Sequence, residues 1–143
     1  TPGYWNRPEA NEASFTGDWF HTGDAARQDE DGYVYIVDRW KDMYISGGEN
    51  VYPAEVEQVY FHHPNVADVA IIGVPDERWG ESGVAVVVLR HPEVFIEEEF
   101  LAFCRDKLAR YKHPKAVWVI DELPRNAAGK VLKRELRVAY EAR

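Results

Sequence analysis

Two early segments of the chain place a charged side chain close to glycine, a combination that suits contact with a ribose or a phosphate. In His21-Thr22-Gly23-Asp24, the Asp24 carboxylate lies on a predicted turn, where it can accept hydrogen bonds from the hydroxyls of a diol. Arg39 belongs to the charged run 38–42, and the glycine turn Ser46-Gly47-Gly48 follows that run. Arginine can bind ribose or phosphate, and paired glycines allow a ligand to approach the backbone.

A third segment, residues 124–130, ends in a lysine that follows Gly129 on a predicted loop. Lys130 can therefore reach a phosphate or a carboxylate as a mobile point charge. Considered alone, each segment favours a simpler interpretation: the aspartate forms a turn, the second segment is a charged hairpin end, and the lysine is solvated. The chemical interpretation gains weight because all three segments occur in one chain, in this order.

Hydrophobic periodicity and turn residues predict the elements that position these segments. Residues 1–32, rich in Gly, Pro, Asn and Asp, suit turns and short strands. Strands are predicted at residues 33–37, 43–45, 66–74, 83–89 and 116–120, with a tight turn at 46–50. Helices are predicted from Pro53 to a stop at 62–64, over residues 97–112, and over about 133–142. This order predicts a small α+β domain with helices on a short sheet.

The charge of the chain is unevenly distributed. The net charge is −8, but residues 1–100 carry 20 acidic and 6 basic side chains, whereas residues 101–143 carry 5 and 11. A basic end on an acidic protein favours a local anionic partner over a nucleic acid. A solvated helix end with extra lysines is the alternative interpretation.

Several function classes are disfavoured by composition. No stretch approaches the roughly 18 apolar residues of a membrane span, and the histidines are too scattered to suggest a metal site. The single cysteine, Cys104, excludes an internal disulfide, is expected in the core, and fits the cytoplasm. The N-terminus has neither signal-peptide features nor an initiator Met, so we expect a piece of a longer cytoplasmic protein.

The segments together closely resemble the acyl- and aryl-CoA synthetases of the AMP-binding, adenylate-forming superfamily, in the fatty-acyl and aryl-CoA ligase branch. The resemblance covers nearly the whole chain and is carried by DWFHTGD, DEDGYVYIVDRWKDMYISGGENVYPAEVE, HPNVADVAIIGVPDERWGE and LPRNAAGKVLKREL. It implies the small C-terminal domain of these enzymes, a short mixed β-sheet with helices packed on it, preceded by a β-hairpin region. Residues 1–38 would then be the tail of the large N-terminal domain, and residues 39–143 the C-terminal lid.

The resemblance also implies a role for each candidate residue. Asp24 and Arg39 match residues that bind the ribose of ATP or AMP, and Ile36 matches an apolar position near the adenine. Lys41 matches the hinge about which the C-terminal domain rotates. The turn Ser46-Gly47-Gly48 matches the one that lines the pantetheine tunnel for CoA.

Lys130 matches the lysine that meets the carboxylate and the α-phosphate during adenylation. The implied reaction joins a carboxylic acid, fatty or aryl, to AMP with release of pyrophosphate, and CoA thiol then displaces AMP. The phosphate-binding loop, the acyl pocket and the Mg²⁺ ligands of the family lie upstream and are absent here. We therefore expect the fragment alone to be inactive, and the identity of the acid stays open.

Two other functions compete with this interpretation. The domain could be a stand-alone lid or docking module without chemistry, or part of an amino-acid-activating adenylation domain. The run Gly47–Pro53 favours the fatty-acyl and aryl-CoA branch over the latter. We also expect that Trp19, Phe20, Val34 and Ile36, if exposed, could form a homodimer through apolar strands.

Overall fold

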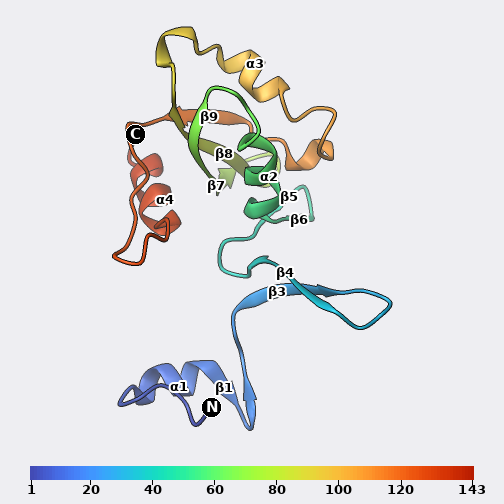
Figure 1. Ribbon diagram of the computed structural model, residues 1–143, viewed down its shortest axis with the longest axis vertical. Coiled ribbons are helices and arrows are strands. Elements are labelled where there is room, and N and C mark those ends of the chain that lie inside the picture. Colours follow the sequence, from blue (N-terminus) through green and yellow to red (C-terminus); the bar gives the residue numbers. More distant parts are fainter. The chain divides into compact units, whose positions relative to one another are not determined.

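The computed structural model describes residues 1–143, which divide into two compact units, residues 1–41 and residues 42–143 (Figure 1). The predicted domain border at residues 38–41 lies beside this division. The assignment of residues 1–38 to a larger N-terminal domain stays a prediction. No helix here combines the length and the hydrophobicity that crossing a bilayer requires.

The first unit consists of one short helix and two small antiparallel strand pairs. Its elements are α1 (Pro8–Ser14), β1 (Phe15–Thr16) with β2 (Trp19–Phe20), and β3 (Asp24–Gln28) with β4 (Val34–Arg39). The expectation of only turns and strands over 1–32 was wrong for α1. Proline at its first position and Glu9 in its first turn are favourable helix-start signals that the sequence already contained.

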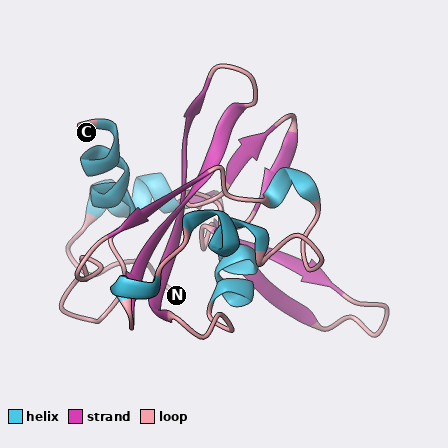
Figure 2. Cartoon of the chain, turned by 90° about the horizontal axis from the view of Figure 1, so that it is seen from above, coloured by secondary structure: helices cyan, strands magenta, loops and turns pink.

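The second unit is built on a mixed five-stranded sheet, which Figure 2 shows with helices beside it. The strand order is β6-β5-β8-β7, and β9 pairs with β8 in parallel, whereas the other pairs are antiparallel. The strands are β5 (Tyr44–Ser46), β6 (Glu49–Val51), β7 (Val66–Asp76), β8 (Gly80–Leu89) and β9 (Ala116–Val119). The helices are α2 (Pro53–Tyr60), α3 (Glu97–Ala102) and α4 (Lys133–Glu141), with 3₁₀ turns at Pro92–Val94 and Arg110–Lys112.

The β7–β8 hairpin is apolar on both faces because helices cover each side. Val69 and Ile71 face a cluster that contains Tyr60 of α2, whereas Ala70 and Ile72 face a second cluster. The second cluster includes Leu136 of α4, which lies on the other side of the sheet (Figure 1). This alternation follows the two-residue period of a strand and accounts for a near-continuous hydrophobic run.

Two predicted elements differ in extent from the structure. The predicted helix at 97–112 is helical only over α3, and successive turns lead to the 3₁₀ turn at its end. Its apolar spacing still identified the buried side, because Phe100 and Cys104 are both in the first cluster, as expected for Cys104. The turn predicted at 46–50 is shorter, since β6 begins at Glu49 and pairs with β5.

Tyr44 packs over a pair of glycines that face each other across β7 and β8. Gly73 and Gly83 are register partners, and a Cβ on either would lie 2.3 Å from a Tyr44 side-chain atom. The Tyr44 hydroxyl is buried without a hydrogen-bond partner, and burial raises the pKa of Tyr44. The absence of side chains at the two glycines therefore fixes where β5 lies.

Replacing Gly83 with alanine should test this packing. The new methyl group would lie 2.3 Å from the Tyr44 hydroxyl oxygen, so the free energy of unfolding should fall by about 1–3 kcal/mol. The measurement is urea denaturation of the variant and the parent protein.

The matched control combines Gly83→Ala with Tyr44→Phe, which removes the hydroxyl and leaves Cζ, 3.1 Å away, as the nearest ring atom. This double variant should recover most of the lost stability. Tyr44→Phe alone should be about as stable as the parent, because the hydroxyl has no partner to lose. Equal stabilities of the single and double Gly83→Ala variants would contradict the proposed packing.

Candidate functional site

The β3–β4 hairpin brings the two candidate ribose-binding residues together. Asp24 and Arg39 are cross-strand partners, and Arg39 Nε lies 2.6 Å from Asp24 Oδ1. The backbone N–H of Asp24 donates to the hydroxyl of Thr22, which orders the turn before the strand. Ile36 is paired with Ala26 on the same hairpin and is 65% exposed. The hairpin thus presents a carboxylate, a guanidinium and an apolar side chain from one small element.

The glycine turn closes the β5–β6 hairpin. Gly47 and Gly48 have φ angles of 61° and 87°, and two consecutive positive φ angles suit a two-residue hairpin loop. The Gly47 N–H donates to the carbonyl of Trp79 at 2.9 Å, and a Cβ on Gly47 would lie 2.9 Å from the indole ring. Ser46 is buried. The turn is therefore packed against Trp79 and exposes backbone rather than side chains.

A pocket of about 500 Å³ lies beside this turn. It combines three cationic side chains with two aromatic ones and a serine: Arg78, Arg110, Lys115, Trp79, Tyr111 and Ser46. The Arg78 guanidinium lies 4.9 Å from the Trp79 ring centroid, and Lys115 Nζ lies 5.7 Å from it. Such a lining suits an anionic group attached to a flat ring.

This pocket was not predicted from the sequence, although it is lined by residues between the predicted strands 66–74 and 83–89 and by residues of the basic segment 101–143. The β5–β8 and β8–β9 pairings, which no local pattern reports, bring these segments together. Asp76 orders the 76–79 turn because its Oδ1 accepts the backbone N–H groups of Trp79 and Arg78, and these bonds lower the pKa of Asp76.

The loop that carries Lys130 has a fixed backbone. Arg125 and Val131 form an antiparallel bridge, and Gly129 has a φ angle of 78°. Asn126 Oδ1 accepts the backbone N–H groups of Ala128 and Lys130, at 3.0 and 2.9 Å. The Lys130 side chain itself is exposed and makes no hydrogen bond or ion pair. A free ammonium group is thus presented from an ordered loop.

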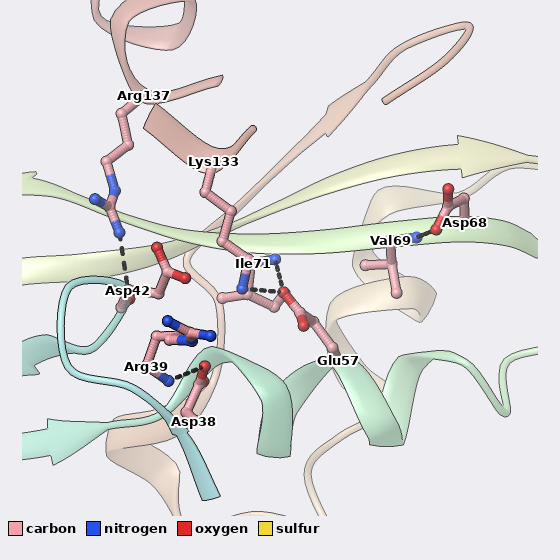
Figure 3. A network of polar contacts seen from close by, with 9 residues as sticks. All are labelled: Asp38, Arg39, Asp42, Glu57, Asp68, Val69, Ile71, Lys133 and Arg137. Carbon is pink, nitrogen blue, oxygen red and sulfur yellow. Dashed lines mark hydrogen bonds and ion pairs between the residues drawn. The ribbon is translucent and has the colours of Figure 1, made fainter. Parts of the chain in front are cut away.

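Helix α4 connects this loop to the start of the second unit. Lys133 Nζ lies 2.6 Å from Glu57 Oε1, which also accepts the N–H of Ile71 at 2.8 Å (Figure 3). Arg137 donates to the backbone carbonyl of Asp42 at 3.2 Å. Asp42 directly follows Lys41, so α4 holds the first residue of the second unit against its core.

Comparison with known protein families identifies the family of this chain. The model of the AMP-binding enzyme C-terminal domain matches residues 55–130, just over half of the chain. The chain belongs to this family. The matched region contains most of the pocket and ends at Lys130, whereas Asp24, Ile36 and Arg39 precede it.

Relatives of this AMP-binding C-terminal domain are CoA ligases. Over 97% of its length the chain is 53% identical to long-chain-fatty-acid–CoA ligase FadD13 of Mycobacterium tuberculosis. Over 96% it is 51% identical to 2-succinylbenzoate–CoA ligase of Geobacillus kaustophilus. The chain spans only 27% and 28% of the lengths of these two relatives.

The structure resembles that of o-succinylbenzoate CoA synthetase (MenE) from Bacillus subtilis, solved with the acyl-adenylate intermediate OSB-AMP. The TM-score is 0.86 at 46% identity, over 94% of this chain and 27% of that one. The same synthetase has also been solved with ATP and a magnesium ion. The predicted family and the fold class, the small mixed helix-and-sheet domain of adenylate-forming enzymes, are therefore confirmed.

Alanine at Gly47 should disturb both the turn and the pocket. A positive φ angle costs a non-glycine residue roughly 1–2 kcal/mol, and the new Cβ would also push against Trp79. We expect a loss of about that size in the free energy of unfolding, together with altered tryptophan fluorescence.

The matched control is Gly48→Ala, because a Cβ at Gly48 meets nothing within 4 Å although its φ angle is also positive. This variant should lose stability without the change in tryptophan fluorescence. Identical fluorescence changes in both variants would show that Gly47 does not set the position of Trp79.

Proposed function

We propose that this chain serves as the C-terminal domain of an AMP-forming acyl-CoA ligase and supplies Lys130 to the first of two half-reactions. In this scheme a carboxylic acid attacks the α-phosphate of ATP to give acyl-AMP and pyrophosphate, and CoA thiol then attacks the acyl carbon and releases AMP. The observation that carries the proposal is the free side chain of Lys130 on an ordered loop at the end of the family match.

The first half-reaction brings anionic reactants together, so a positioned cation should lower its barrier. An ammonium group about 4 Å from a phosphoryl oxygen is worth on the order of 4 kcal/mol at an effective dielectric constant of about 20. That energy corresponds to roughly a thousandfold in rate. Lys130 has no partner within the chain to compete for its charge.

The nucleotide is proposed to contact the β3–β4 hairpin. Asp24 Oδ1 is engaged by Arg39, which leaves the second carboxylate oxygen to accept the ribose hydroxyls. The exposed side chain of Ile36 would pack near the adenine. In this proposal the three residues contribute to one nucleotide site that is completed by a larger N-terminal domain.

The second half-reaction is proposed to use the other functional surface of the domain. Rotation about Lys41 would exchange Lys130 for the Ser46-Gly47-Gly48 turn, whose exposed backbone would line the path of the pantetheine arm. The adjacent pocket, with Arg78, Arg110 and Lys115, suits the phosphate groups at the nucleotide end of CoA.

The identity of the acid is not assigned to this domain. The two similar ligases are named for a long-chain fatty acid and for 2-succinylbenzoate, so one C-terminal domain type accompanies different acids. No three His, Cys, Asp or Glu side chains gather here as a metal site, and we propose that Mg²⁺ is held with ATP by the larger domain. A homodimer through the exposed side chains of Trp19, Phe20, Val34 and Ile36 stays a prediction.

Lys130→Ala in the complete ligase should lower the rate of acyl-AMP formation by roughly a thousandfold. Formation of the thioester from preformed acyl-AMP and CoA should be nearly unchanged. The measurements are pyrophosphate release with candidate fatty and aryl acids, and thioester formation in a separate assay.

Lys107→Ala is the matched control, because Lys107 is also an exposed lysine but bonds the carbonyl of Phe103. It should leave both half-reactions intact. Equal losses of both half-reactions in Lys130→Ala would refute the division of labour proposed here.

Removal of the pocket cations should weaken CoA binding. Arg110→Ala or Lys115→Ala removes a charge-assisted contact, so KM for CoA should rise about tenfold for each. The rate of acyl-AMP formation should stay the same. Arg105→Ala, an exposed arginine outside the pocket, is the control. An unchanged KM for CoA in both pocket variants would exclude this pocket as the CoA phosphate site.

A further inference from the structure

The guanidinium of Arg125 joins the sheet to the residue just before Lys130. Its Nη1 donates to the carbonyl of Gly129 at 2.6 Å, and its Nη2 lies 2.5 Å from Asp68 Oδ2. Asp68 belongs to β7, 57 residues away in sequence. One planar group thus ties the lysine loop to the central hairpin of the domain.

The carboxylate that receives Arg125 is itself held in place. Asp68 Oδ1 accepts the backbone N–H of Val69 at 3.0 Å (Figure 3), which leaves Oδ2 for the guanidinium. A β-bulge between Val66 and Asp68 interrupts the regular pairing with β8 at this position. Bulges redirect side chains, so the bulge accounts for an acidic side chain aimed from β7 toward the loop.

The energetics argue against a mainly stabilising role for this pair. The Arg125 and Asp68 side chains are 43% and 26% exposed, and ion pairs this accessible contribute little to folding. The geometry is specific nevertheless, because the planar guanidinium uses one nitrogen for the carboxylate and the other for the backbone carbonyl, in a fixed relative direction. An ion pair that adds little stability but requires a specific geometry is suited to positioning a neighbouring group.

We infer that Arg125 and Asp68 are positioning residues for Lys130, a role that rests on the function proposed above for that lysine. Neither residue touches the reacting atoms. Arg125 fixes the Gly129 carbonyl, and Asn126 fixes the Lys130 N–H, so both sides of the Gly129–Lys130 peptide are held. The flexible Lys130 side chain then starts from a backbone position that does not move, which raises the fraction of time its ammonium group spends at the phosphate.

The test compares Arg125→Ala, Arg125→Lys and Asp68→Asn in the complete ligase. Arg125→Ala should slow acyl-AMP formation about tenfold to a hundredfold, the scale expected for a misplaced catalytic group. Asp68→Asn keeps an oxygen for Val69 but places an amide N–H₂ group, a donor, where Arg125 needs an acceptor; the bond from Arg125 to the Gly129 carbonyl is retained, so the loss should be smaller. Arg125→Lys should resemble Arg125→Ala, because one ammonium group cannot reproduce the fork. Arg105→Ala and Asp106→Asn are the matched exposed controls and should change nothing.

Two readouts separate positioning from a general structural role. Thioester formation from preformed acyl-AMP should be unchanged in all three variants, whereas a damaged fold would slow both half-reactions. In a Lys130→Ala background, Arg125→Ala should cause no further loss of acyl-AMP formation, because the group it positions is gone. Equal loss of both half-reactions, or an additive loss in the double variant, overturns the inference.

Hydrogen exchange distinguishes failure of this inference from failure of the proposed function. Mass spectrometry of the complete protein should show faster amide exchange across residues 126–130 in Arg125→Ala, whatever the activity. Unchanged amide exchange in these residues overturns the positioning role inferred for Arg125, even if the ligase is active. If the parent protein forms no acyl-AMP with any tested acid, the proposed function is overturned. The role of Lys130, on which the positioning role of Arg125 and Asp68 depends, is then overturned too.

Discussion

Burial of the β7–β8 hairpin on both faces is the constraint on which the second unit depends. Because successive side chains point to opposite faces, the hairpin needs one layer containing α2 and α3 and another containing α4. The candidate functional features of this unit are attached to this framework. The glycine turn joins it where Ser46 pairs with Gly80, and the Lys130 loop leads from β9 into α4. The loops to which we assign chemistry are thus connected to a buried sheet.

The same framework explains why the functional groups can be exposed. A lysine buried with its partner would lose its freedom to reach an external phosphate, so the ordering has to come from the backbone beneath it. Asn126 and Arg125 supply that ordering at the Lys130 loop, and Trp79 supplies it at the glycine turn. In both places rigid main chain, rather than a buried side chain, defines the site.

Features encoded by local sequence could be predicted, and features made by distant pairing could not. The β-branched runs of β7 and β8, proline at the start of α2 and the Gly129–Lys130 loop are local signals, and the structure contains all these elements. The pocket escaped prediction because it needs sheet pairings to join residues near 79 with residues near 111. The Arg125–Asp68 pair spans 57 residues and leaves no local pattern. The prediction of a helix over 97–112 was wrong beyond α3. The spacing of its apolar residues indicates which side chains are buried, and successive turns can bury the same side chains.

The structure shows where the excess basic residues of the C-terminal segment lie. Composition could not separate an anionic partner from a solvated surface, because it counts every cation equally. In the structure two groups of these cations can be distinguished. One group is paired with carboxylates of the same unit: Lys112 with Glu55, Lys133 with Glu57, and Arg125 with Asp68. The other group, which includes Lys130 and the pocket residues Arg110 and Lys115, is exposed and outside any ion pair. The paired cations join separate segments of the second unit, whereas Lys130, Arg110 and Lys115 are left to meet an anionic ligand. Three of the cations that give residues 101–143 their excess charge are therefore exposed where the proposed half-reactions need them.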